Sequence, residues 1–124
     1  MSENNEKEIC KRTRLFAIEI IKIVNFFPKT SAGFQIGQQI IGSGTSVGAN
    51  MEEAQDAISR KEFIKIINIS LKEVRETIYW LKLIKESKLI ISDKIDYLLN
   101  EASQLRAIIA AIIRKTRGNN SIKQ

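Results

Sequence analysis

Large apolar residues recur at intervals of three and four positions along four separate stretches of the chain. This is the spacing of one face of an α-helix, whereas a half-buried β-strand alternates apolar and polar residues every second position. A single proline and 6% aromatic residues also argue against a sandwich or barrel, which needs many turns and strand-forming residues. We therefore predict an all-α protein.

The first two helices are expected over residues 8–27 and 31–57. Pro28 ends the first, because proline restricts the residue before it. Gly37, Gly42, Gly44 and Gly48 interrupt the second, and each interior glycine costs ~1 kcal/mol relative to alanine, so a loop is the alternative. A helix is favoured, since three of these glycines would share one face at 100° per residue and let a neighbouring helix approach closely.

The last two helices carry clear start signals. Ser59-Arg60-Lys61-Glu62 has the spacing of a capping box, which predicts a helix over residues 60–87. Ser92 is the expected N-cap of a helix over residues 93–117, with Gly118 as its stop and a polar tail over residues 119–124. Four helices with short connections predict one domain, an antiparallel up-down four-helix bundle.

The third helix carries a second line of residues away from its core stripe. Its members are spaced 4, 3, 4, 3, as in the seam of a packed helix pair: Ile69, Glu73, Glu76, Trp80 and Leu83. A wide core face would explain them, but apolar residues alternating with carboxylates favour a subunit interface. We predict that this line, the interface stripe, joins copies of the chain.

The second helix carries a polar line with the same spacing. It consists of small and polar residues: Gln39, Ser43, Ser46, Asn50 and Glu53. If the line is exposed, it is an ordinary solvated face. If it meets the third helix or another subunit, its members must be hydrogen-bonded, and Ser43, Ser46, Asn50 and Glu53 then form a polar network.

The chain has 20 Lys and Arg residues against 14 Asp and Glu, a net charge of +6. This excess permits binding to nucleic acid or to an acidic protein, and it fits a plain soluble protein equally well. The candidate nucleic-acid-binding residues are Arg60, Lys61, Lys65, Arg106, Arg114, Lys115 and Arg117. Cations at a helix C-terminus are also a routine stabilising device, but repeated round a ring of subunits they would attract phosphates. Few aromatic residues are available for base stacking, which favours charge-based binding over sequence reading.

Several kinds of chemistry lack the residues that they need. The chain has no histidine, which excludes Ser-His and Cys-His nucleophiles and the usual zinc and di-iron sites. Glu52, Glu53 and Asp56 are more simply a solvated acidic patch than a cation site. The single Cys10 forms no internal disulfide, and no apolar run reaches the ~20 residues of a membrane helix. We expect a cytoplasmic protein without catalytic activity, metal or cofactor.

Three segments together resemble a known family: residues 43–54 (SGTSVGANMEEA), 59–63 (SRKEF) and 69–81 (ISLKEVRETIYWL). In this order and spacing they are similar to bacterial four-helix-bundle proteins encoded within intervening sequences of large-subunit rRNA genes. The resemblance implies up-down bundles that form cyclic oligomers, pentamers in particular. A distantly similar bundle is the nucleic-acid-binding accessory subunit of diversity-generating retroelements, which partners a reverse transcriptase.

The leading hypothesis is a homo-oligomeric bundle, a ring of five, that binds RNA or DNA electrostatically. Its rival is a protein-interaction or scaffold module whose basic groups serve solubility alone. A carboxylate metalloenzyme ranks well behind both.

Overall fold

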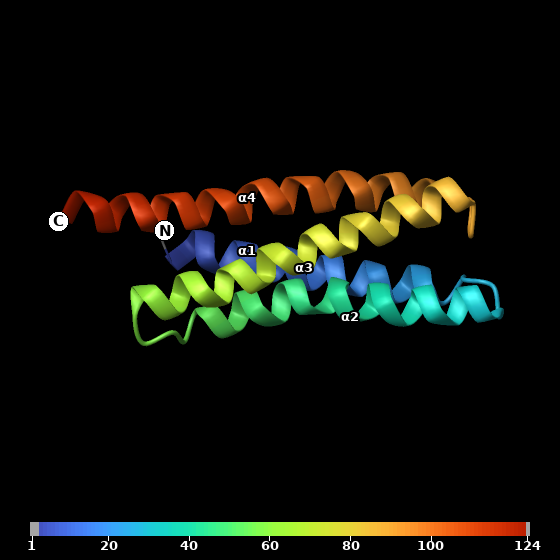
Figure 1. The fold of residues 1–124 in the computed structure, drawn as a ribbon, viewed down its shortest axis with the longest axis horizontal. Helices are drawn as coiled ribbons and strands as arrows, with labels where there is room; N and C mark the ends of the chain where they lie inside the picture. The colour runs from blue at the N-terminus through green and yellow to red at the C-terminus, as the bar shows by residue number, and fades with distance from the viewer. Residues whose placement is uncertain (1–2, 124) are drawn as a thin grey trace.

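The computed structural model describes the backbone of residues 3–123 and the side chains of residues 8–118. Within that range all regular structure is helical: α1 (Glu3–Val24), α2 (Ser31–Ala54), α3 (Arg60–Ser87) and α4 (Asp93–Lys123). Four long helices lie side by side, and consecutive helices run in opposite directions (Figure 1). The predicted all-α, antiparallel four-helix bundle is confirmed.

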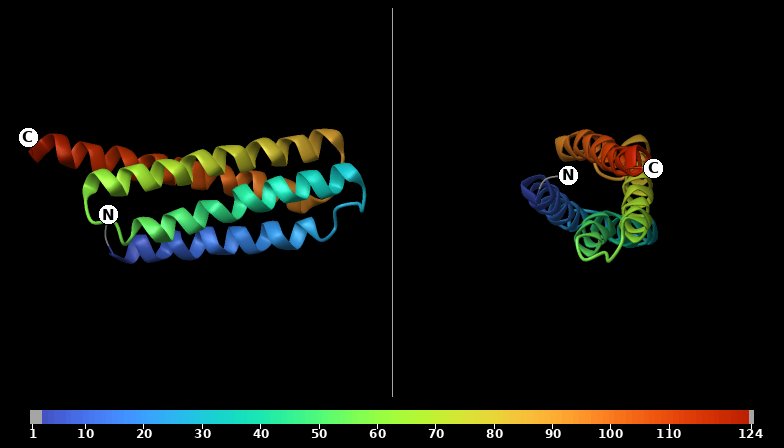
Figure 2. Two further views of the ribbon diagram at one scale, coloured as in Figure 1. Left: turned by 60° about the horizontal axis from the view of Figure 1, so that its bottom comes forward. Right: turned by 90° about the vertical axis from the view of Figure 1, so that its left-hand side faces the viewer.

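The helices follow one another round the bundle in chain order. Each contacts the next, α1 with α2, α2 with α3 and α3 with α4, and a sparser contact between α4 and α1 completes the circuit. The end-on view in Figure 2 shows this arrangement, with α1 and α3 on opposite sides. The α2–α3 connection, the start of α1 and the end of α4 all lie at one end of the bundle (Figure 1).

Short side chains begin three of the helices. The Ser59 hydroxyl accepts a hydrogen bond from the Glu62 N–H at 3.1 Å, and the Glu62 carboxylate accepts one from the Ile58 N–H at 2.7 Å. Thr30 caps α2 by accepting from the Gly33 N–H at 3.1 Å. Ser92 accepts from the Lys94 N–H at 3.2 Å and begins α4. These bonds satisfy N–H groups that have no partner within their own helix, which fixes where each helix starts.

α2 is continuous through its glycines. Gly37, Gly44 and Gly48 are buried and point at α1. A Cβ atom on Gly44 would lie 3.1 Å from the Ile20 side chain, and one on Gly48 would lie 3.1 Å from the Thr13 hydroxyl oxygen. The absent side chains therefore allow α1 and α2 to pack closely, and the prediction of one glycine-containing helix is confirmed.

The core is mostly isoleucine and leucine. Its fully enclosed side chains come from all four helices and include Phe16, Ile20, Ile40, Met51, Ile67, Leu81, Ile84, Leu98, Leu105 and Ile109. Burying each large apolar side chain contributes roughly 1.5–3 kcal/mol, so this layer dominates the stability of the bundle. Among the described helices, none is long and apolar enough to cross a membrane.

Two predicted helix ends are three residues too late. α1 ends at Val24 rather than Phe27, and α2 ends at Ala54 rather than Ala57. The Phe27 N–H donates to the Val24 carbonyl and the Ala57 N–H to the Ala54 carbonyl. Both bonds reach back three residues rather than four, so the chain tightens into a turn before it leaves the helix.

The outer ends of the first and last helices extend beyond the prediction. α1 begins at Glu3 rather than residue 8, because glutamate and lysine are good helix formers even where no apolar pattern marks them. α4 continues through Gly118 to Lys123. A glycine stop needs a left-handed backbone, and no glycine in the described part of the chain adopts one. The expected non-helical tail is therefore wrong over residues 119–123.

Candidate nucleic-acid interface

One exposed line of side chains runs along α3 with the spacing 4, 3, 4, 3, 4, 3, 4. We call it the basic seam, and it consists of Lys61, Lys65, Asn68, Lys72, Arg75, Tyr79, Lys82 and Glu86. Every member is exposed, five carry a positive charge, and no acid appears before Glu86. An ordinary solvated helix face mixes both signs, so a line of one sign produces a directed positive field.

The seam is straight and long. Lys61 and Lys82 are 21 residues apart on one helix, which corresponds to about 32 Å at 1.5 Å per residue. The acids Glu73 and Glu76 lie on another side of the same helix, roughly a quarter turn away. The twist of the helix therefore separates charges that alternate in the sequence.

Cations of α4 extend this positive surface. The Lys85 ammonium meets the Asp96 carboxylate at 2.7 Å, which places the start of α4 beside the end of α3. The C-terminal half of α4 consequently runs beside the first half of α3. Arg106, Arg114 and Arg117 are exposed there, along the side of α4 on which Leu99 and Ser103 line a groove with α3.

Six of the seven cations predicted as nucleic-acid-binding residues lie toward one end of the bundle, Arg106 lies near the middle of α4, and the seven do not share one face. Lys61 and Lys65 belong to the seam, whereas Arg60 is half-buried at the first position of α3. Lys115 lies on the other side of α4, where it lines a cleft of about 380 Å³ against Glu8, Ile9 and Arg12 of α1. The structure therefore brings the predicted α3 lysines together with three of the four α4 cations and separates Lys115 from them.

Sequence reasoning missed the central members of the seam, Lys72, Arg75 and Tyr79. In the sequence, Lys72-Glu73-Val74-Arg75-Glu76 looks charge-balanced. A search for one sign of charge at alternating spacings of four and three would have found them.

The interface stripe lies on the side of α3 nearest α2. Ile69 is 41% exposed, while Trp80 is half-buried and packs against the core. Burial raises the pKa of Glu73 above its ordinary value, and the nearby charge of Glu76 raises it further, while Lys72 acts in the opposite direction. The stripe thus combines partly exposed apolar side chains with Glu73, a carboxylate whose ionised form is disfavoured in the folded chain.

Trp80 is the member of the stripe most engaged with its own chain. Its ring meets Tyr79 edge-on, with centroids 5.0 Å apart. Its indole N–H is buried and has no acceptor among the described residues. Trp80 is therefore part of a wide core face of α3, the alternative explanation for the stripe. Ile69 is the stripe residue most available to another molecule.

Only one member of the polar line on α2 bonds across to α3. Ser43 is buried and accepts a hydrogen bond from the Thr77 hydroxyl at 2.9 Å. Ser46 donates to the Gly42 carbonyl and Asn50 donates to the Ser46 carbonyl, both within α2, and Glu53 is exposed. The expected set is therefore not a single network in this chain.

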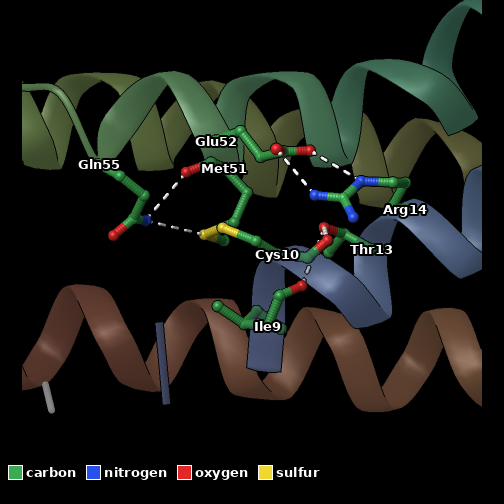
Figure 3. Close-up of polar contacts among 7 residues, drawn as sticks. All are labelled: Ile9, Cys10, Thr13, Arg14, Met51, Glu52 and Gln55. Carbon is green, nitrogen blue, oxygen red and sulfur yellow. Dashed lines mark hydrogen bonds and ion pairs between the residues drawn. The ribbon is translucent and has the colours of Figure 1, made fainter. Parts of the chain in front are cut away.

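Of the carboxylates weighed as possible cation ligands, Glu52, Glu53 and Asp56, the first is paired with an arginine of α1. Glu52 accepts two hydrogen bonds from the Arg14 guanidinium, the shorter at 2.9 Å, and so joins α2 to α1 (Figure 3). Thr13 lies beside this pair and donates to the Ile9 carbonyl within α1. Among the described side chains, no group of three or more potential metal ligands is gathered.

The chain is similar to a known protein family in sequence and to a solved structure in fold. The model of the 23S rRNA-intervening sequence protein family matches residues 5–111. The chain is also similar to the crystal structure of a protein of unknown function from the S23 ribosomal protein family of Bacteroides thetaiotaomicron VPI-5482. That similarity has 34% sequence identity and a TM-score of 0.79, over 85% of this chain and 97% of the other. No match is found among curated proteins.

Proposed function

The chain belongs to the 23S rRNA-intervening sequence protein family, and from that premise we propose that it is a non-catalytic, self-assembling bundle that binds nucleic acid, RNA above all, through its basic surface. The basic seam is the observation that carries this proposal. Its five exposed cations without an intervening acid are positioned to neutralise phosphates and release their counterions.

The charge distribution over the remaining helices supports the same function. α2 has no Lys or Arg in its 24 residues, and it ends with Glu52 and Glu53. Most exposed cations of α3 and α4 lie on the side of the bundle away from α1, whereas Lys94 and Lys115 lie toward α1, which has exposed cations of its own such as Lys11. Such asymmetry steers an anionic polymer to that side.

Self-assembly is the second part of the proposal, with a ring of five copies as the proposed form. The interface stripe supports it, because Ile69 is partly exposed and Glu73 is partly buried next to another carboxylate. A cation supplied by a second copy would stabilise Glu73 in its ionised form. The stripe and the basic seam lie on different sides of α3, so both can be occupied at once.

The direct test titrates a labelled RNA hairpin and a labelled DNA duplex with the protein at low and at moderate salt, with the oligomer mass measured in parallel. We expect binding to the RNA at low salt and a steep loss of affinity as salt rises. Absence of binding to both at low salt would refute the nucleic-acid function. A monomeric mass would refute the assembly.

A protein-interaction module is the second candidate function, and one observation favours it. α1 and α2 expose large apolar side chains, with Ile18 40%, Ile21 45% and Phe34 64% exposed. Such residues on one side of a small protein are typical of contact surfaces for other proteins, a reverse transcriptase among them. Recovery of a stoichiometric protein complex without bound nucleic acid would support this candidate over the first.

A further inference from the structure

We propose that the basic seam binds a nucleic-acid duplex lengthwise, along about one helical turn, through the phosphates alone. This inference rests on the proposed nucleic-acid function and specifies the class of ligand. Four features of the described residues carry it: the length of the seam, its scarcity of stacking groups, the packing of α3 between α2 and α4, and the position of the seam on one side of the bundle.

The length of the seam matches a duplex. The cations extend over about 32 Å of a straight helix, and one turn of a DNA duplex is about 34–36 Å long. A rigid rod of this length, laid along the outside of a duplex, meets the phosphates of both strands where each backbone crosses its course. A flexible single strand has no such fixed line of charge to match.

Stacking groups are scarce on this side of the molecule. Proteins that bind single strands stack successive bases on several aromatic rings. Tyr79 is the one aromatic of the seam, and its ring is engaged edge-on with Trp80. The other exposed tyrosine, Tyr97, lies under the Lys94 ammonium, which itself meets Glu19 of α1 at 3.2 Å. Tyr97 therefore belongs to the α1 side and not to the seam.

Access to base edges is limited on this side of the bundle. Direct reading of sequence relies on pairs of hydrogen bonds from Arg, Lys, Asn or Gln, delivered by a helix that enters a groove. The seam has such side chains, Arg75 and Asn68 among them, but α3 is packed between α2 and α4 and does not project from the bundle into a groove. The seam is thus equipped to contact phosphates and not to select a sequence.

The basic seam lies on one side of the bundle, facing away from α1. α1, with its own exposed Lys11, lies on the opposite side from α3 and makes no contact with it in the described part of the chain. Arg106, Arg114 and Arg117 of α4 flank the seam and widen the surface on which a duplex rests. A duplex bound to α3 therefore leaves α1 and α2 uncovered.

The test compares one strand of about twelve nucleotides with the duplex that it forms, in RNA and DNA versions, by fluorescence anisotropy over a salt series. Such a duplex is just over one turn long and fits one seam. We expect tighter binding of the duplex than of the strand. The slope of log affinity against log salt should be about −4 to −5, from five phosphate contacts at −0.9 each. A preference for RNA or for DNA duplex distinguishes the two sources of phosphate, and either supports the inference.

Three variants locate the contact. We expect Arg75→Glu to weaken duplex binding about tenfold and to reduce the salt slope, since a phosphate contact is lost and a repulsion is gained. Lys11→Glu, the same charge change on α1, should alter it less than about twofold. Tyr79→Ala should also leave duplex affinity within about twofold. Circular dichroism confirms that each variant folds, and Lys72→Glu replaces Arg75→Glu if that variant does not.

The outcomes separate this inference from the function on which it rests. No binding of any strand or duplex at low salt overturns the proposed function. Equal or tighter binding of the single strand, or a large loss with Tyr79→Ala, overturns the duplex inference and leaves nucleic-acid binding in place. An equal effect of Arg75→Glu and Lys11→Glu overturns the assignment to the seam.

Discussion

The glycines of α2 differ in what surrounds them, although the sequence presents them alike. Gly33 lies in the first turn, where an added Cβ would overlap the Pro28 carbonyl oxygen. Gly44 and Gly48 face side chains of α1 at 3.1 Å. A Cβ added at Gly42 would meet no atom within 4 Å, and the residue faces solvent. A side chain would thus overlap backbone at Gly33 and be tightly placed at Gly44 and Gly48, and nothing in the structure requires glycine at Gly42.

Two alanine substitutions test this distinction. Gly33→Ala should lower the melting temperature, because the new methyl group clashes with backbone and the turn has to shift. Gly42→Ala should raise the free energy of unfolding by about 0.5–1 kcal/mol, the usual gain for alanine over glycine in a helix. Thermal unfolding followed by circular dichroism measures both. Equal shifts in the two variants would contradict the close approach of Gly33 to the Pro28 carbonyl.

α3 is the element that serves most purposes, because three of its sides have separate roles. Ile67, Val74 and Leu81 enter the core, the interface stripe borders α2, and the basic seam faces outward. Ser70 and Thr77 tie the helix to α2 by hydrogen bonds of 2.7 and 2.9 Å, from hydroxyl groups that are fully buried. Because these core contacts and hydrogen bonds hold α3 in place, they also fix where the backbone of the basic seam lies relative to the core.

The titration of Glu73 gives α3 a pH dependence. Its pKa lies above the ordinary value of 4.5, so its ionised form destabilises the folded chain. As the pH falls through the raised pKa, the folded state takes up a proton before the unfolded state does, and stability rises. The effect is complete below 4.5, where both states are protonated.

At a protein concentration low enough to keep the chain monomeric, we therefore expect Glu73→Gln to melt at a higher temperature than the unmodified chain at pH 7, and the two to converge near pH 4. Glu86→Gln, an exposed residue on the same helix, is the matched control and should change little. Melting curves at the two pH values provide the measurement. A monomeric Glu73→Gln variant no more stable than the unmodified chain at pH 7 would contradict the electrostatic cost of this carboxylate. A loss of stability confined to the assembled protein would instead be the effect of the cation that the proposed assembly supplies.

The sequence alone predicts the four helices, but it does not predict much of the candidate nucleic-acid interface. Apolar spacing and the caps Ser59 and Ser92 predict where helices begin, because these signals are local. Lys72 and Arg75 were missed since acids lie beside them in the chain, and only the helical twist separates the two signs. The bond between Thr77 and Ser43 depends on how α2 and α3 slide past one another, which no local signal fixes.

The whole molecule presents two contrasting sides, and self-assembly must leave the positive one free if both proposals hold. The interface stripe satisfies this condition. We expect Ile69→Glu to lower the oligomer mass, because a charge would replace a partly exposed apolar side chain within the contact. Ile91→Glu makes the same change at a residue that is 85% exposed in the α3–α4 connection, and its mass should match that of the unmodified protein.

Light scattering coupled to gel filtration measures these masses. The unmodified protein should give a mass near five times that of the 14.1 kDa chain. An Ile69→Glu variant of unchanged oligomer mass would show that the stripe is not the contact.

Lysine footprinting tests the central claim most directly. The protein is treated with an amine-reactive reagent in the presence and absence of a short RNA duplex, and mass spectrometry measures how fast each lysine is modified. The duplex should protect Lys61, Lys65, Lys72 and Lys82 of the seam and leave Lys11, Lys22 and Lys29 at their original rates. Protection of Lys11, Lys22 and Lys29 instead, or uniform rates across all seven, would contradict the assignment of nucleic-acid binding to α3.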